Sequence, residues 1–132
     1  MPIPQAAALA LHDGRVCLVT AKSGWRWVVP KGKLKPGQSA RDAAQAEAWE
    51  EAGVLGAASP SPIGTYSYTK FETVYEVAVY RLDVTTIRNK WPEQRARERR
   101  WFTPQDAANL IHEPELRQIL IDAMADLLVA TV

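Results

Sequence analysis

The sequence has one cysteine and no apolar run long enough to cross a membrane. Cys17 is the single cysteine among 132 residues, so the chain cannot form an internal disulfide. It lies in the apolar run Val16-Cys17-Leu18-Val19, where a thiol usually serves as a small core hydrophobe. A helix that spans a bilayer needs roughly 20 mostly apolar residues, and the N-terminal segment lacks the basic start of an export signal. We therefore expect a cytoplasmic protein with no membrane segment.

The chain also lacks a strong excess of charge of either sign. Its 16 Lys and Arg residues and 15 Asp and Glu residues give a net charge of +1. Proteins that bind nucleic acid usually carry a strongly basic surface, so nucleic acid is not an expected partner. A local cluster of cations can still hold a small anion. With 47% hydrophobic composition and no repeat or linker, residues 1–132 are expected to form one domain.

Turn residues and apolar periodicity predict a mixed α/β architecture. Two apolar runs at residues 5–11 and 15–21 flank Asp13-Gly14, a dipeptide that favours a tight β-hairpin. The segments 63–69 and 73–84 are rich in Tyr, Thr and Val and predict a second strand pair. The expected fold is one sheet packed between helices. Further strands are expected at residues 25–29 and 99–102, a loop at 31–38, and helices at 39–51, at 104–110 and after Pro114.

The expected helices carry start and packing signals. Ser39, with Asp42 three residues later, resembles a capping box, and Gly53 follows the expected helix end. Thr103 and Pro104 mark the start of the second helix in the same way. The last helix has an apolar stripe at steps of three and four residues, which we expect to pack in the core: Leu116, Ile119, Leu120, Ala123, Met124, Leu127 and Leu128.

Three glutamates lie on one face of the helix expected at residues 39–51. Glu47, Glu50 and Glu51 stand at positions i, i+3 and i+4, which places them within about 100° of arc. No Lys or Arg lies four residues from any of them, so the helix itself provides no charge compensation. An acidic face can be a solvated surface, but Mg²⁺ prefers carboxylate oxygens and bridges to phosphate oxygens. The triplet is therefore a candidate metal site for phosphate chemistry.

The residues around this triplet carry a family signature. The pattern resembles the Nudix box, Gly-x5-Glu-x7-Arg-Glu-U-x-Glu-Glu-x-Gly-U, in which U is an aliphatic residue. Its spacing agrees over residues 32–54. Gln38 and Ala46 replace a Glu and an Arg that pair with each other in the family, and losing both avoids a partly buried charge without its partner. From Gly32 the chain reads Gly-x5-Gln38-x7-Ala46-Glu47-Ala48-x-Glu50-Glu51-x-Gly53-Val54.

The resemblance implies a fold, a cofactor and a set of site residues. A Nudix fold is an α/β/α sandwich with a mixed β-sheet between helices. By this resemblance Glu47, Glu50 and Glu51, helped by the Gly32 carbonyl, hold one or more Mg²⁺ ions, with Mn²⁺ as an alternative. Water attacks a phosphorus of a diphosphate that is linked to another group, and a carboxylate accepts the proton. Glu51 is the preferred base and Glu47 the next, although some Nudix enzymes draw the base from another loop.

A weaker likeness concerns the substrate. Residues 26–30 and 99–102 resemble the subgroup that hydrolyses diphosphoinositol polyphosphates and dinucleoside polyphosphates. Both substrates are small, strongly anionic molecules. Solvated loop charges are the alternative explanation for the basic residues in these segments. The cations that we expect to bind the substrate are Arg26, Lys31, Lys33 and Arg99.

Two functions remain open at this point. The first is a Mg²⁺-dependent pyrophosphohydrolase, and the second is a catalytically weak Nudix-like module that binds a nucleotide or polyphosphate as a sensor. Gln38, which replaces the first box Glu, makes the second conceivable. Tyr66, Tyr68 and Trp91 are candidates for stacking on a base, with packing on the sheet or in the core as the alternative. The oligomeric state stays open.

Overall fold

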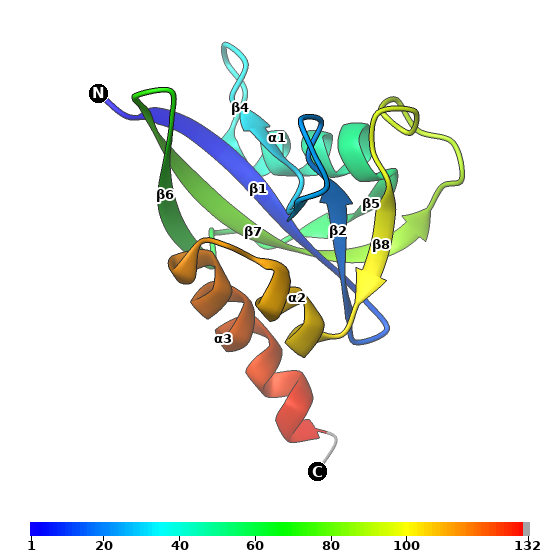
Figure 1. Cartoon of the computed structure of the whole chain (residues 1–132). Helices are drawn as coiled ribbons and strands as arrows, with labels where there is room; N and C mark the ends of the chain where they lie inside the picture. The colour runs from blue at the N-terminus through cyan, green and yellow to red at the C-terminus, as the bar shows by residue number, and fades with distance from the viewer. Residues whose placement is uncertain (131–132) are drawn as a thin grey trace.

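The described chain forms one mixed sheet with helices on both of its faces (Figure 1). The structure is a computed structural model and describes the backbone of residues 1–130 and the side chains of residues 1–125. The central strand order is β3-β2-β1-β7-β5, while β4 pairs with β1, β6 with β7 and β8 with β2. The pair β1·β7 is parallel and the others are antiparallel. The strands are β1 (Ile3–His12), β2 (Arg15–Thr20), β3 (Trp27–Val28), β4 (Lys31–Lys33), β5 (Val54–Ala58), β6 (Gly64–Lys70), β7 (Thr73–Ile87) and β8 (Arg99–Phe102).

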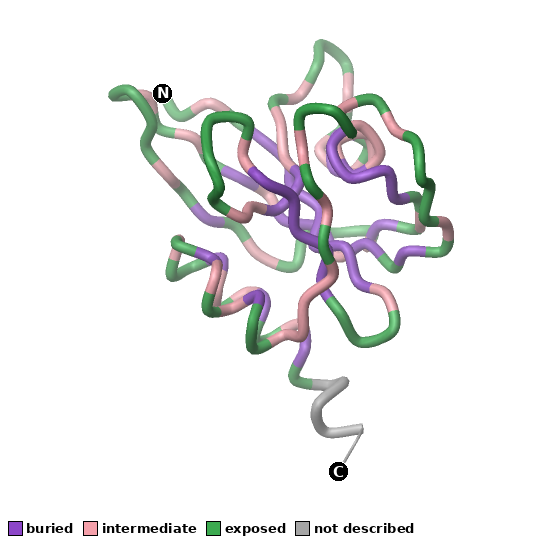
Figure 2. The backbone as a smooth tube through the Cα atoms, turned by 45° about the vertical axis from the view of Figure 1, so that its right-hand side comes forward, coloured by how far each residue is buried: buried purple, intermediate pink, exposed green. Residues whose placement is uncertain are grey.

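The central strand β1 is buried on both faces, which explains its almost continuous apolar sequence. Residues alternate between the two sides of a strand. Ala6, Ala8 and Ala10 face one core cluster, and Ala7 and Leu9 face the other. Figure 2 shows buried backbone along the centre of the sheet and exposed backbone at the turns and loops. Because both faces are covered, the protein is an α/β/α sandwich, and the expected fold class is confirmed.

Helix α1 (Ala40–Glu47) covers the face lined by small side chains. Its start is as expected, since the Ser39 side chain accepts a hydrogen bond from the Asp42 amide. Four helix alanines meet the alanines of β1, and small residues on both sides allow a close approach of helix and sheet. The alanines on the helical side are Ala43, Ala44, Ala48 and Ala52.

The expected single helix at residues 39–51 is not uniform. After Glu47 the chain continues as η1 (Ala48–Ala52), a π-helical turn, and it ends at Gly53 in the left-handed conformation, with φ of 67°. A π-turn inside a helix widens the spacing of successive side chains and is often found at functional sites. The prediction of a helix end before Gly53 is confirmed, whereas the regular α-helical geometry assumed for the glutamates is wrong.

Helices α2 (Pro104–Leu110) and α3 (Pro114–Ala130) cover the opposite face. Thr103 caps α2 by accepting from the Asp106 amide, as its sequence predicts. In α3 the residues Leu116, Leu120 and Met124 are buried against the sheet. Ile119 and Ala123 are partly buried against the same cluster, so this part of the predicted stripe is confirmed. Leu127 and Leu128 lie outside the residues whose side chains are described.

Three strand assignments differ from the sequence expectations. The loop expected at residues 31–38 begins with the short strand β4, which pairs with residues 5–7 of β1. Strand β5 was not predicted, because Val54-Leu55-Gly56 directly follows a helix and carries little periodic signal. The strand expected at residues 25–29 is reduced to Trp27–Val28. In each case pairing with a distant strand decided the conformation, and local sequence does not encode such pairing.

The remaining strand predictions hold. Asp13 and Gly14 both have positive φ and join β1 to β2, and Phe71 and Glu72 do the same between β6 and β7. Cys17 is fully buried, and burial raises the pKa of its thiol to about 12, as expected for a core residue. In the described part of the chain, no helix is both long enough and apolar enough to span a bilayer.

The neighbours Leu120 and Ile121 test the packing of α3, because their exposed fractions are 0% and 46%. Leu120→Ala removes buried methyl groups and is expected to lower the free energy of unfolding by about 2–5 kcal/mol. Ile121→Ala is the matched surface control and should change it by about 0.5 kcal/mol. Urea unfolding followed by circular dichroism measures both. Equal effects of the two substitutions would contradict the docking of α3 on the sheet.

Candidate active site

The helix end and strand β4 bring Glu47 and Gly32, two of the predicted metal ligands, into contact. Glu47 is the last residue of α1, and Glu50 and Glu51 belong to η1. A Cβ atom added to Gly32 in β4 would lie 2.2 Å from Oε1 of Glu47. The Glu47 carboxylate therefore lies directly against the Gly32 backbone, in space that any larger residue would fill. The proximity of Gly32 to the glutamates, suggested by the family pattern, is present in this fold.

Glu47 and Glu51 form a close pair of carboxyl groups. Each carboxyl group lies close enough to affect the pKa of the other. Burial, together with the neighbouring Glu51 carboxyl group, raises the pKa of Glu47 above its usual range. Burial also raises the pKa of Glu51, an effect that the Arg97 guanidinium opposes. A cation placed between two neighbouring carboxylates would favour the ionised form of both.

Cations from distant loops compensate the acidic cluster. Arg97 Nη2 lies 3.3 Å from Oε2 of Glu51, and both side chains are buried. Lys35 Nζ lies 3.8 Å from Oε1 of Glu50 at a more exposed position. The helix itself provides no compensating charge, as the sequence indicates, and the cations come from loops distant in sequence. Within the described residues, no three His, Cys, Asp or Glu side chains converge closely enough to form a complete metal shell.

The Arg97 guanidinium contacts residues of three separate segments. Its Nε donates to Glu93 at 2.8 Å and its Nη1 donates to the Thr20 carbonyl at 2.9 Å, in addition to the Glu51 contact. Lys22 Nζ contacts the same Glu93 carboxylate at 3.4 Å. The guanidinium thus joins η1, the end of β2 and the β7–β8 loop. Arg97 fixes the position of the Glu51 carboxylate.

Trp91 and Arg99 pack against the backbone of η1, the segment that carries Glu50 and Glu51. Trp91 Nε1 donates to the Glu51 carbonyl at 3.0 Å, and a Cβ on Gly53 would collide with its ring. Arg99 lies over that ring at 4.3 Å and donates to the carbonyls of Ala52 and Arg88. Both side chains satisfy backbone groups at the helix end, which need partners once the helix stops.

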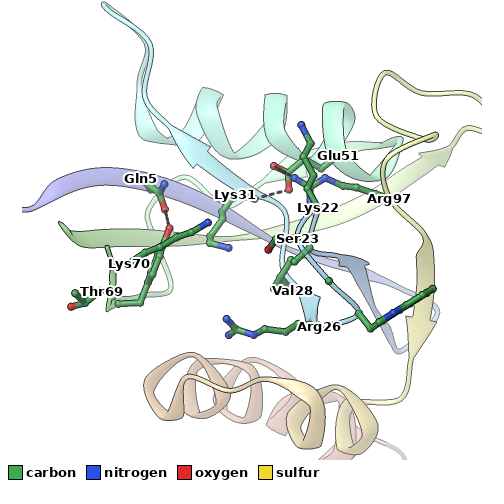
Figure 3. Close-up of a pocket in the computed structure, with 14 residues that line it drawn as sticks. Gln5, Lys22, Ser23, Arg26, Val28, Lys31, Glu51, Thr69, Lys70 and Arg97 are labelled. Atoms are coloured by element: carbon green, nitrogen blue, oxygen red, sulfur yellow. Dashed lines mark hydrogen bonds and ion pairs between the residues drawn. The ribbon is translucent and has the colours of Figure 1, made fainter. Parts of the chain in front are cut away.

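A cavity of about 590 Å³ opens next to Glu51. Figure 3 shows Glu51 and Arg97 near the α1 end of the cavity and Arg26 at the opposite end, toward α2 and α3. Five cations and a single carboxylate line it, so it has a strong positive excess suited to polyphosphate. The charged lining residues are Lys22, Arg26, Lys31, Lys70 and Arg97, with Glu51 as the acid.

The cavity includes two of the four cations expected to bind substrate. Arg26 forms an ion pair with Glu113, and Lys31 lies over the Tyr68 ring at 5.4 Å. Burial lowers the pKa of Lys31, while the charge of Glu51 opposes this shift. Lys33 is exposed on β4 outside the cavity lining, and Arg99 is engaged behind the glutamates. The positions of Lys33 and Arg99 therefore do not support the expected contacts with substrate.

Sequence reasoning missed several residues of the cavity. Arg97 was one of six basic residues in the segment 88–100, and no local signal set it apart. Gln5 on β1 accepts a hydrogen bond from the Tyr68 hydroxyl at 2.7 Å and lines the same wall. Polar residues inside an apolar strand, as Gln5 is, are the one signal that could have indicated a site. Gln38, the replaced box residue, has a local role, since its side chain accepts from the Lys35 amide at 3.0 Å.

Comparison with known proteins agrees with this geometry. A family model described as the NUDIX domain matches residues 1–123. Nudix hydrolase 12, mitochondrial, of Arabidopsis thaliana is 34% identical over 103 residues, which cover 72% of this chain and 51% of that protein. Diphosphoinositol polyphosphate phosphohydrolase 3-beta of Bos taurus is 33% identical over 93 residues, covering 67% of this chain and 56% of that protein.

Solved structures share the same fold. A NUDIX hydrolase from Nitrosomonas europaea superimposes with a TM-score of 0.77 at 22% identity, covering 96% of this chain and 90% of that one. The Ap4A hydrolase of C. elegans gives a TM-score of 0.75 at 20% identity, covering 96% and 99%. The sandwich with its loop-helix acidic cluster is thus that of a Nudix domain. The chain belongs to the Nudix family, and it spans about half the length of the curated relatives cited above.

Arg97 provides a stability test of this site. Arg97→Met keeps the apolar stem but leaves the buried Glu51 without its cation, and we expect the free energy of unfolding to fall by about 3 kcal/mol. Arg100→Met is the control, because Arg100 and its partner Glu98 are both largely exposed and such pairs contribute below about 1 kcal/mol. Thermal and urea unfolding at neutral pH measure both. A loss as small as that of the control would show that Arg97 does not hold Glu51.

Proposed function

We propose that this Nudix domain, residues 1–132 with its box at 32–54, is a Mg²⁺-dependent pyrophosphohydrolase. It cleaves a phosphoanhydride bond of a diphosphate linked to another group. The observation that carries the proposal is the carboxylate cluster of Glu47 and Glu51 against Gly32, at one end of a basic cavity. Membership of the Nudix family and the hydrolase names of the relatives support it.

The residues at the helix end fit a hard divalent cation. Glu47, Glu50, Glu51 and the Gly32 carbonyl offer oxygen donors only, which is the set that Mg²⁺ prefers. Gly32 leaves the space that a Cβ would fill, and the raised pKa of Glu47 reflects its burial beside the Glu51 and Glu50 carboxyl groups. When bound, Mg²⁺ supplies charge neutralisation for the phosphates and lowers the pKa of the attacking water. Mn²⁺ suits the same donors.

Glu51 is the proposed general base. Its carboxylate lines the cavity and is held by the Lys31 amide at 3.3 Å and by Arg97 at 3.3 Å. These contacts favour the ionised form, which can accept a proton from water. Glu47 is the second candidate, and burial beside the Glu51 carboxyl group raises its pKa. Arg26 and Lys31 bind the phosphates that are not attacked, because both line the cavity beyond Glu51.

The substrate we propose is a diphosphoinositol polyphosphate or a dinucleoside polyphosphate. Relatives named for the first and a structural neighbour named for hydrolysis of Ap4A make both reasonable. The excess of cations in the cavity suits either, since both carry many phosphates. We propose a cytoplasmic location, although several relatives are named as mitochondrial.

The test is phosphate release from a substrate panel with Mg²⁺, by wild type and by Glu51→Gln. The panel contains a diphosphoinositol polyphosphate, diadenosine tetraphosphate, a nucleoside triphosphate and a sugar nucleotide. Glu51→Gln keeps the shape of the side chain but removes the base, so kcat is expected to fall by roughly 10²-fold or more without loss of folding. Glu115→Gln, at an exposed position of α3 away from the cavity, is the matched control and should keep wild-type kcat.

Three outcomes separate the alternatives. Wild-type turnover that Glu51→Gln abolishes supports the proposed base. Turnover retained by Glu51→Gln contradicts the base assignment and directs attention to Glu47. Tight binding of a polyphosphate with no turnover of any diphosphate would instead favour the sensor module that the replacement of the box Glu by Gln38 suggests.

Gly32→Ala tests the cation site independently of turnover. Its added Cβ must displace the Glu47 carboxylate. We therefore expect the Mn²⁺ affinity to weaken by roughly tenfold or more, the size of effect seen when a residue that orients a metal ligand is mutated. Gly24→Ala is the control, because a Cβ there meets nothing within 4 Å. Titration calorimetry with MnCl₂ measures both variants. Equal Mn²⁺ affinities for Gly32→Ala and wild type would remove Glu47 from the ligand set.

A further inference from the structure

Trp25 is an exposed tryptophan at the rim of the cavity. It was expected in a strand, but it lies in the β2–β3 loop with 86% of its surface exposed. The loop is compact, because the Ala21 amide donates to the Arg26 carbonyl at 2.8 Å and the Gly24 amide donates to Ala21 at 3.3 Å. Its backbone thus has a defined shape. An indole that is exposed on such a loop does not contribute the stabilising free energy that its burial would provide.

The aromatic residues first considered for base stacking are engaged elsewhere. Tyr66 is buried in the core, and Tyr68 stacks on Tyr75 at 5.0 Å while its hydroxyl bonds to Gln5. Trp91 is held behind the glutamates by Arg99 and the Glu51 carbonyl. Trp27 packs edge-on against Phe102 at 5.1 Å. Among the aromatic residues that line the cavity, only Trp25 has most of its surface exposed, within the described chain.

Trp25 stands between two adjoining cavities. The first is the cavity that contains Glu51, and the second, of about 510 Å³, lies between the β2–β3 loop and the β7–β8 loop. Lys22, Trp25 and Arg97 line both, and Arg95 adds a cation to the second. A flat apolar surface flanked by cations matches a molecule that joins an aromatic ring to phosphates. Inositol polyphosphates have phosphates but no aromatic ring.

We propose that Trp25 is a specificity-determining residue that stacks on the nucleobase of a nucleoside polyphosphate, with Lys22 and Arg95 beside the adjoining phosphates. The inference rests on the proposed function and selects the nucleotide class among its substrates. Stacking of a base on an aromatic side chain is sequence tolerant, since every base has a π face. Trp25 touches the base and takes no part in the cleavage of the anhydride.

The experiment measures binding with two ligands that cannot be cleaved between their phosphorus atoms. α,β-Methylene-ADP and methylenediphosphonate carry the same bridged phosphorus groups, with and without the nucleoside. We expect Trp25→Ala to weaken binding of α,β-methylene-ADP by roughly 5- to 100-fold. Its affinity for methylenediphosphonate should stay within about twofold of wild type. Trp25→Phe keeps an aromatic face and should recover most of the loss. Titration calorimetry in the presence of Mg²⁺ gives all the dissociation constants.

Phe71→Ala is the matched control. Phe71 is 90% exposed on the β6–β7 turn and lines neither cavity, so its removal should leave both affinities unchanged. Equal weakening of both ligands by Trp25→Ala would show that Trp25 only shapes the loop, and it would overturn the proposal. Wild-type affinities that are the same for the two ligands would overturn it as well. Binding does not depend on turnover, so failure of the hydrolase proposal appears separately, as a lack of phosphate release from the substrate panel.

Discussion

The contact between the Glu47 and Glu51 carboxyl groups is the interaction on which the site depends. Two acids at the end of a buried helix repel each other when both are ionised, and burial strengthens that repulsion. The pKa of Glu47 is raised as a result, and the Arg97 guanidinium compensates the charge of Glu51. It also leaves an open space at Gly32, where a larger residue would displace the Glu47 carboxylate. Breaking any of these arrangements leaves a buried charge without a partner.

The packing of small residues sets where this pair lies. Alternate alanines of β1 and four alanines of the helical segment let the helix settle close to the sheet. The helix then changes to a π-turn at Ala48 and stops at Gly53, where only a residue tolerant of positive φ fits against Trp91. The end of the helix therefore lies close to β4, the end of β2 and the β7–β8 loop. These contacts place the acids of one segment opposite Lys35 and Arg97 from two others.

The charge of the molecule is balanced overall but strongly separated at the cavity. The net charge is only +1, yet the cavity is lined by five cations and one carboxylate. Lys22, Glu93, Arg97 and Glu51 form a chain of alternating charges, so the cavity wall is held together by its own ion pairs. Such a wall is rigid enough to orient an anion and leaves other cations, Lys31 and Lys70 among them, to contact it.

Local chemistry along the chain encodes several elements of the fold. The turn at Asp13-Gly14, the caps at Ser39 and Thr103 and the helix end at Gly53 follow from backbone preferences of single residues. The spacing over residues 32–54 likewise identified the acidic cluster and the family. These features need no knowledge of distant parts of the chain.

Contacts between distant parts of the chain select the residues that surround the cluster. Strands β4 and β5 form because they pair with β1 and β7. Their own sequences show little alternation of apolar and polar residues. Arg97 joined the site and Arg99 did not, although both lie in one basic segment. Arg97 lies in the loop before β8, where it contacts Glu51 and Glu93, whereas Arg99 begins β8 and lies over the Trp91 ring. Trp25 became a surface residue because β3 starts two residues later than its composition suggested. Each outcome depends on contacts between residues far apart in the chain, which no local pattern records.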